Sequence, residues 1–267
     1  MHIVDTHTHA SPDWFEPVET LLHVMEANGI AQAVLVQFRG NFHNEYIFEC
    51  TRRFPGRFIA CAALDVAAPD APATLRALAR RGAAGVRFWL HKDGAIAPDS
   101  LWRAADDLGL AVSVIGTEEE FGADELRRLA STFVNTRIVI EHFGRAGRDE
   151  PPPYTRYRRV LALADFPNVY MKLGGLGEIC HRPAVFPAGN PFPVVPPFAR
   201  MAVEAFGPQR LMFGSDFPPV TYREGLRNAL RGLQDHLSWL PPDDLHWIFG
   251  RTALAVWKFP QDSATPP

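Results

Sequence analysis

Short apolar segments alternate with longer amphipathic segments along most of the chain, and this alternation constrains the fold more than any other feature. The apolar segments span 3–9, 32–38, 57–65, 83–90, 110–116, 137–144, 168–175 and 210–217. Most are rich in Val, Ile and Phe and are continuous rather than alternating. Such runs are typical of strands that are buried on both faces of a parallel sheet.

The intervening segments have the periodicity of amphipathic helices, and several end at glycine, a helix-stop signal. Examples are 18–29, 73–82, 98–109, 123–133 and 222–233. Eight strand–helix units in this length predict an α/β fold, a single (β/α)8 TIM barrel, since such a barrel takes about 250 residues. Its active site would lie at the C-terminal ends of the strands. The alternative is an open doubly wound sheet, but no nucleotide-binding glycine fingerprint follows the first strand.

No internal domain boundary is evident. We expect the barrel to span 1–259, with a last helix at 242–257, and 260–267 to form a loose C-terminal tail. Two segments on the face of the strands' C-terminal ends, 148–153 and the proline-rich 181–197, are long enough to form a pocket rim, although the role of 181–197 is not evident.

The composition narrows the range of partners. The net charge of −3 offers no basic field for nucleic acid, and no apolar run approaches the ~20 residues of a membrane helix. The N-terminus has no basic region followed by an apolar stretch, so we expect a cytoplasmic location. Cys50, Cys61 and Cys180 fit neither a disulfide framework nor a CxxC metal site. A small-molecule substrate is therefore the expected partner, and a homo-oligomer is possible.

The first apolar segment ends in Asp5-Thr6-His7-Thr8-His9. Residues two apart in a strand point to the same side, so His7 and His9 can converge at the barrel mouth. Two imidazoles at this spacing suit a divalent metal such as zinc. The spacing alone is a weak signal, and its position at a strand end is what gives it meaning.

Two further side chains end strands of the same predicted barrel. Asp216 ends the eighth apolar segment, which neighbours the first in a closed barrel, so Asp216 can bind a metal or take a proton from water. His142 ends the sixth and can act as an acid or base or polarise a carbonyl. The alternatives are that Asp216 is a helix cap or turn former and that His142 is a core residue.

Several polar residues could contact a substrate. Arg87 lies within an apolar strand, where an unpaired charge is costly, so it either forms a structural ion pair or binds an anionic or polyhydroxylated substrate. The same ambiguity applies to Lys172. The other substrate-binding candidates are Lys92, Asn41 and His43, and the weaker ones are His91, Arg145, Glu178 and His181.

Together, DTHTH, IEHFG, VYMKLGGLGE, MFGSDFP and the closing IFGRTALAVW resemble the amidohydrolase-2 branch of the amidohydrolase superfamily of metal-dependent hydrolases. The resemblance covers nearly the whole chain. GVRFW, the Lys-containing seventh strand and GSDFP are most similar to lactonases, including the 2-pyrone-4,6-dicarboxylate and sugar-acid lactonases. The seventh strand offers no arginine before Arg182, which argues against a dicarboxylate substrate.

The departures from that branch bear on metal. Its metal-dependent members place a histidine at the end of strand 5, where this chain has Gly116 and Thr117. Binuclear members use a strand-4 lysine, where this chain has Arg87. The resemblance thus implies either no cofactor or one divalent ion, zinc being the first choice, held by His7, His9 and Asp216 with His142 as a possible fourth ligand.

The predicted activity is hydrolysis of a lactone or related cyclic ester of a small acid. Asp216 would activate water, and His7, His9 and His142 would polarise the carbonyl and stabilise the oxyanion. The alternatives are a metal-dependent non-oxidative decarboxylase on the same fold and a non-catalytic barrel that binds a small acid. The missing strand-5 histidine argues against the decarboxylase.

Overall fold

Eight parallel strands form one sheet in chain order in the computed structural model, which describes residues 1–90, 97–187 and 191–259. The strands are β1 Ile3–Thr8, β2 Ile30–Val36, β3 Phe58–Ala63, β4 Ala83–Trp89, β5 Ala111–Ile115, β6 Ile138–Ile140, β7 Val169–Leu173 and β8 Leu211–Phe213. Thr8 pairs in parallel with Phe217, just beyond β8, so the last strand returns to the first. The prediction of a (β/α)8 barrel is confirmed.

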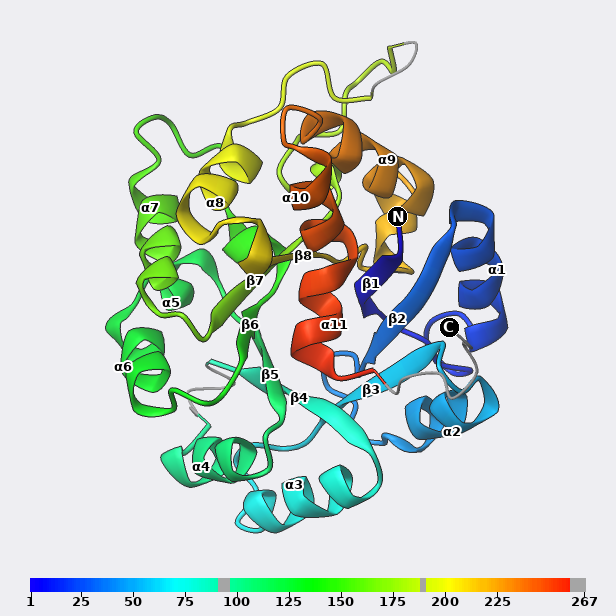
Figure 1. Cartoon of the computed structure of the whole chain (residues 1–267), viewed down its shortest axis with the longest axis vertical. Coiled ribbons are helices and arrows are strands. Elements are labelled where there is room, and N and C mark those ends of the chain that lie inside the picture. The colour runs from blue at the N-terminus through cyan, green and yellow to red at the C-terminus, as the bar shows by residue number, and fades with distance from the viewer. Residues whose placement is uncertain (91–96, 188–190, 260–267) are drawn as a thin grey trace.

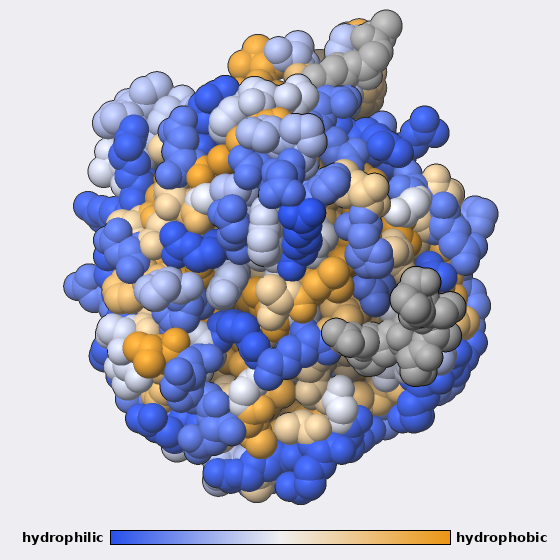
Figure 2. Space-filling view, viewed as in Figure 1, coloured by the Kyte–Doolittle hydropathy of each residue, from blue (hydrophilic) through white to orange (hydrophobic). Residues whose placement is uncertain are grey.

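The helices surround this barrel (Figure 1). They are α1 Val18–Asn28, α2 Glu45–Arg53, α3 Ala71–Arg80, α4 Asp99–Asp107, α5 Glu118–Phe121, α6 Asp124–Thr132, α7 Thr155–Leu161, α8 Phe198–Phe206, α9 Leu226–His236, α10 Pro242–His246 and α11 Thr252–Trp257. Across the described ranges, every helix is too short or too polar to cross a membrane. The face seen in Figure 2 is mainly hydrophilic, with apolar residues interspersed.

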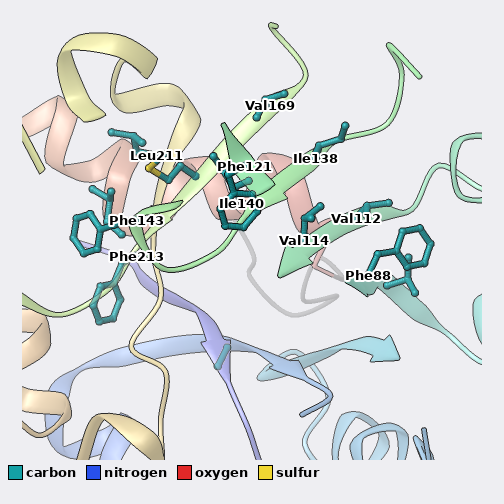
Figure 3. Packing of buried hydrophobic residues seen from close by; sticks show 14 of the residues in the cluster. Phe88, Val112, Val114, Phe121, Ile138, Ile140, Phe143, Val169, Leu211 and Phe213 are labelled. Atoms are coloured by element: carbon teal, nitrogen blue, oxygen red, sulfur yellow. The ribbon is translucent and has the colours of Figure 1, made fainter. Parts of the chain in front are cut away.

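The core has two layers, because alternate strand residues point to opposite sides of the sheet. The larger layer lies between strands and helices and includes the side chains of β5 and β6 drawn in Figure 3. The smaller layer fills the barrel, where Val34 and Ile59 pack with Val256 and Trp257 of α11. These strand residues precede the strands' C-terminal ends, so α11 closes the opposite, N-terminal end of the barrel (Figure 1).

Gly85 of β4 allows this closure. A Cβ at position 85 would lie 2.6 Å from Cζ3 of Trp257 and 2.7 Å from the carbonyl oxygen of Ala111. A larger residue would therefore require the Trp257 indole or the backbone of β5 to shift. The glycine of the GVRFW motif is thus explained by packing at the end of the barrel away from the strands' C-termini.

Strands β6 and β8 end earlier than the sequence predicts. The apolar pattern extends to residues 144 and 217, but the strands stop at Ile140 and Phe213. Beyond β6 the chain enters a left-handed turn in which His142, Phe143, Gly144 and Arg145 all have φ between 54° and 62°. Beyond β8, Asp216 has φ 62°. This conformation is unfavourable by about 1–2 kcal/mol for each L-residue that adopts it, so the backbone is strained at both points.

Candidate active site

The four predicted catalytic side chains lie together at the C-terminal end of the barrel. Asp216 Oδ1 is 3.4 Å from His9 Nε2 and 3.8 Å from His7 Nε2. The ring centre of His7 is 5.0 Å from that of His9 and 4.6 Å from that of His142. All four residues are at most 8% exposed. Strands 1, 6 and 8 thus deliver three imidazoles and one carboxylate to one point, as the sequence predicts.

The hydrogen bonds of His7 and His9 determine which ring nitrogen faces the site. His9 Nδ1 donates to the carbonyl oxygen of Val36 at 2.7 Å, so a neutral His9 has its lone pair on Nε2. His7 Nδ1 is 3.0 Å from Nζ of Lys172. An ammonium there can only donate, which leaves the proton of a neutral His7 on Nε2. That Nε2 is buried and has no hydrogen-bond partner among the described residues.

Asp216 is held as a carboxylate. Arg223 Nη1 donates to its Oδ2 at 2.9 Å, which leaves Oδ1 facing His7 and His9. Burial alone would raise the pKa of Asp216, but the charges of His142, His9 and Arg223 around it hold that pKa well below its usual range. At neutral pH Asp216 can therefore accept a proton and cannot donate one.

His142 is oriented by Glu178, a residue of the turn that follows β7. His142 Nδ1 lies 2.9 Å from Glu178 Oε1, so the carboxylate fixes the Nδ1 proton and leaves Nε2 for the site. Arg223 Nη2 lies 3.4 Å from the same Glu178 oxygen. Arg223 therefore links Glu178 to Asp216. Through Glu178, this link also includes His142.

The glycines of the LGGLGE motif make room for two buried carboxylates. A Cβ at Gly174 would lie 2.2 Å from Cδ of Glu178, and one at Gly175 would lie 1.9 Å from Oε1 of Glu224. Burial raises the pKa of Glu224, and its Oε1 accepts the backbone N–H of Gly177. The glycines thus explain how Glu178 approaches His142 so closely.

Below the histidines, the barrel holds a buried charged network. Arg87 donates to both oxygens of Glu141, at 3.0 and 2.7 Å, and Ser113 donates to Glu141 at 2.7 Å. Lys172 donates to Ser113 Oγ at 2.9 Å and contacts His7. Burial alone would raise the pKa of Glu141, but the charges of Arg87 and Lys172 hold it well below its usual range. Burial lowers the pKa of Lys172 and that of His7, which is therefore neutral at pH 7.

The predicted substrate-binding residues occupy other positions. Arg87 and Lys172 are 3% and 1% exposed, and the ion-pair alternative given for Arg87 describes its position in the structure. Asn41 Oδ1 accepts the backbone N–H of His43 within the loop after β2, and His43 is exposed. Lys92 and His91 lie outside the described residues, as does the predicted tail 260–267.

Sequence reasoning assigned no role to Arg223, Glu141 or Ser113. Arg223 lies within 222–233, which has a helical pattern, but the helix begins only at Leu226 and Arg223 belongs to the preceding turn. Gly225, with φ 79°, marks that break and is the signal that could have indicated it. A signal for Glu141 does exist in the sequence. It is the only acidic residue in the apolar segments 83–90 and 137–144, and a buried Arg87 needs an acidic partner.

The geometry also bears on metal binding. Among the described residues, His7, His142 and Asp216 form a group whose ligand atoms all lie within 4.8 Å of one another. This set contains His142 in place of His9, which the sequence favoured as a ligand. With the unpartnered His7 Nε2, it fits one divalent ion. At Gly116, a Cβ would lie 3.1–3.3 Å from Glu120, Leu90 and Phe121, so the strand-5 position is tightly enclosed.

Two cavities lie next to each other here and share Arg145. The His142 cavity, of about 140 Å³, is lined by His142, Arg145, Ala146, Arg148, Glu178 and Arg223. The adjoining cavity, of about 490 Å³, is lined by Arg39, Trp89, Ile115, Gly116, Thr117, Glu118, Glu120 and Arg145. Residues of the proline-rich 181–197, including Phe186 and Phe192, line a third cavity of about 400 Å³ together with Arg148 and Arg223. The long loop therefore contributes to a pocket rim.

Comparisons with known proteins show what the chain is similar to. The amidohydrolase family profile matches residues 4–259. A 4-sulfomuconolactone hydrolase of Rhizobium radiobacter is 30% identical over 224 residues, which are 77% of this chain and 67% of that protein. An L-fucono-1,5-lactonase of Burkholderia ambifaria is 28% identical over 248 residues, 80% of each chain. A Pseudomonas putida structure assigned as a 2-pyrone-4,6-dicarboxylic acid hydrolase superposes with a TM-score of 0.78 at 22% identity, covering 98% and 99% of the two chains.

Proposed function

The chain belongs to the amidohydrolase family of enzymes, and on that premise we propose that it opens a lactone or related cyclic ester of a small acid. The observation that carries the proposal is Asp216, an ionised carboxylate that is only 8% exposed and whose Oδ1 faces His7 and His9. The relatives that hydrolyse lactones support the choice of substrate. That the substrate is the lactone of a small acid is part of this proposal.

Asp216 acts as the general base. Its Oδ1 takes a proton from a water molecule while the water oxygen attacks the carbonyl carbon of the lactone. Arg223 fixes the other oxygen, Oδ2, so the carboxylate presents one oxygen in one direction. A carboxylate of low pKa is a weak base, and the reaction therefore depends on strong polarisation of the carbonyl.

His7 supplies that polarisation. With Lys172 donating to Nδ1, the proton of His7 lies on Nε2, a buried donor without a partner among the described residues. The carbonyl oxygen of the substrate would provide the missing acceptor, and the hydrogen bond strengthens as negative charge develops on that oxygen. Lys172 thus acts by fixing the tautomer of His7.

His142 faces the leaving group. Breaking the acyl carbon–oxygen bond produces an alkoxide, which takes the proton that Asp216 received from water, directly or through Nε2 of His142. The products are the free hydroxyl and the carboxylic acid of the opened ring, so water is consumed and no other reactant is required. Glu178 keeps the His142 ring in the orientation that this transfer needs.

One divalent ion would be held by His7, His142 and Asp216. When bound, such an ion supplies Lewis-acid polarisation of the carbonyl. In that state His7 would carry its proton on Nδ1 and donate it in a hydrogen bond to Lys172 as a neutral amine, which would leave the lone pair of Nε2 free. His9 and Arg223 retain their contacts with Asp216 in either state.

The test is Asp216→Asn, assayed on a panel of γ- and δ-lactones with a pH indicator. We expect kcat to fall about 10²- to 10⁴-fold, the usual contribution of a general base. Asp107→Asn, on the exposed end of α4, is the matched control and should match the wild type. Undiminished turnover by the folded Asp216→Asn variant would refute the assignment.

A further inference from the structure

Arg145 is shared by the His142 cavity and the adjoining cavity. Both open at the C-terminal ends of the strands, and Arg145 follows His142 by three residues. A ligand whose carbonyl lies beside His142 therefore has Arg145 in the wall of the same cavity. A substituent that extends from this ligand into the larger cavity passes the Arg145 side chain.

The backbone holds Arg145 in a strained conformation. It closes the left-handed turn that begins at His142, with φ 60°. Strain of this kind is concentrated at functional sites, because the surrounding structure must maintain it. His142 and Arg145 are placed by the same turn, whose Gly144 packs so tightly that a Cβ there would lie 2.5 Å from Val160.

Arg145 is exposed and, unlike its neighbours, has no partner among the residues that the structure describes. Arg148 donates to the backbone carbonyls of Gly177 and Glu178, and Arg223 binds Asp216. Within residues 1–90, 97–187 and 191–259, the guanidinium groups of Arg145 and Arg39 form no hydrogen bond or ion pair. The two cationic candidates from the sequence, Arg87 and Lys172, are used inside the barrel.

The acidic residues of the adjoining cavity are engaged elsewhere. Glu118 accepts the backbone N–H of Gly147 and pairs with Arg156, and Glu120 caps the first turn of α5 through Thr117. Among the described residues that line this cavity, the charged side chains that form no hydrogen bond or ion pair are therefore the two arginines, Arg39 and Arg145.

We propose that Arg145, with Arg39 across the adjoining cavity, binds a carboxylate on the substrate and so selects anionic lactones. This inference rests on the proposed function, because it places the carboxylate relative to a lactone carbonyl at Asp216. A guanidinium and a carboxylate match in two parallel hydrogen bonds, so the pair also fixes the orientation of the ring. The substrate class is a lactone that bears a carboxylate on the side of the ring facing β2, β4 and β5.

The experiment compares a δ-lactone carboxylate with its carboxamide, which has the same shape and no charge. For the wild type we expect kcat/KM to favour the carboxylate. In Arg145→Gln, that preference should fall about 10- to 100-fold, the range for losing hydrogen bonds to a charged group. Arg39→Gln should reduce it less, and Arg76→Gln, on the exposed face of α3, should leave it unchanged.

Calorimetry with glutarate separates this proposal from the proposed function. Glutarate binding that weakens about tenfold or more in Arg145→Gln supports the subsite, even if no lactone is turned over and the hydrolase assignment fails. Equal turnover of both lactones, with glutarate binding unaffected by Arg145→Gln, overturns the subsite while the lactonase activity stands. An equal loss on both lactones in Arg145→Gln also overturns it, because Arg145 would then act without regard to charge.

Discussion

Replacement of Glu141 by glutamine tests the charged network below the histidines. Glu141 is fully buried and is the counter-charge of Arg87, which is 3% exposed, and of Lys172, which is 1% exposed. Glutamine keeps the shape, but its amide nitrogen would face a donor of Arg87, and two buried cations would lose their carboxylate. Removing one partner of a buried pair costs about 3–5 kcal/mol.

The assay is urea unfolding at pH 7. The free energy of unfolding of Glu141→Gln should fall by about 3–5 kcal/mol, which corresponds to a decrease of roughly 6–20 °C in Tm for a chain of this size. Glu125→Gln is the matched control, because Glu125 pairs with Arg128 at the surface, and we expect it to cost at most about 1 kcal/mol. The double variant Arg87→Met/Glu141→Gln should recover part of the loss, since it also removes the unpaired guanidinium.

The same variant changes the response to pH. The pKa of Glu141 is lower in the folded protein than in the unfolded chain, so its contribution is present above about pH 5 and is lost as the pH falls. Unfolding of Glu141→Gln should therefore depend less on pH on the acid side. A loss below about 1 kcal/mol at pH 7, or a double variant no more stable than the single one, would refute the reasoning.

Three other changes test the site. Glu178→Gln should lower kcat about 10- to 100-fold with little change in KM, because it loosens the orientation of His142. Glu178→Asp should retain part of the kcat that Glu178→Gln loses. Steady-state kinetics with equal effects on kcat and KM would argue against a positioning role. Gly174→Ala should lower the free energy of unfolding by about 1–3 kcal/mol, because the new Cβ displaces Glu178. Thermal unfolding of this variant, of Glu178→Ala and of the double variant should show that the two losses are not additive. Gly232→Ala is the control and should cost little, since the nearest atom to its Cβ would lie at 3.6 Å. Calorimetric titration should give one zinc ion per chain, bound much more weakly by His142→Ala; unchanged binding by that variant would exclude His142 as a ligand.

The barrel could be predicted because its information is local. Continuous apolar runs such as 32–38 and 57–65 identify buried parallel strands, and their number identifies the closed sheet. His7, His9, His142 and Asp216 could be found for a related reason. Residues at the C-terminal ends of barrel strands meet at one mouth, whatever their separation in the chain.

The role of Arg87 could not be predicted from the sequence, because it depends on a contact across 54 residues. A strand pattern shows that an arginine is buried but not which residue of another strand faces it. Arg145 is the converse case. It looks like an ordinary loop arginine, and only the left-handed turn places it beside His142. The early ends of β6 and β8 were missed for the same reason, since the apolar pattern continues after the backbone has left the sheet.

The site consists of two ionic networks that meet at the histidines. The lower one, Arg87–Glu141–Ser113–Lys172, lies inside the barrel and ends on Nδ1 of His7. The upper one, Asp216–Arg223–Glu178, lies above the strands and ends on Nδ1 of His142.

Each network therefore contacts Nδ1 of its histidine and leaves Nε2 on the other side of the ring. Both carboxylates nearest the histidines, Glu141 and Asp216, are kept ionised by neighbouring cations. Arg223 binds Asp216 and also lines the His142 cavity, whereas Arg87 and Lys172 are buried inside the barrel. Among the described residues, Arg145 is the arginine of that cavity whose guanidinium forms no hydrogen bond or ion pair, which is why we propose that it binds the substrate.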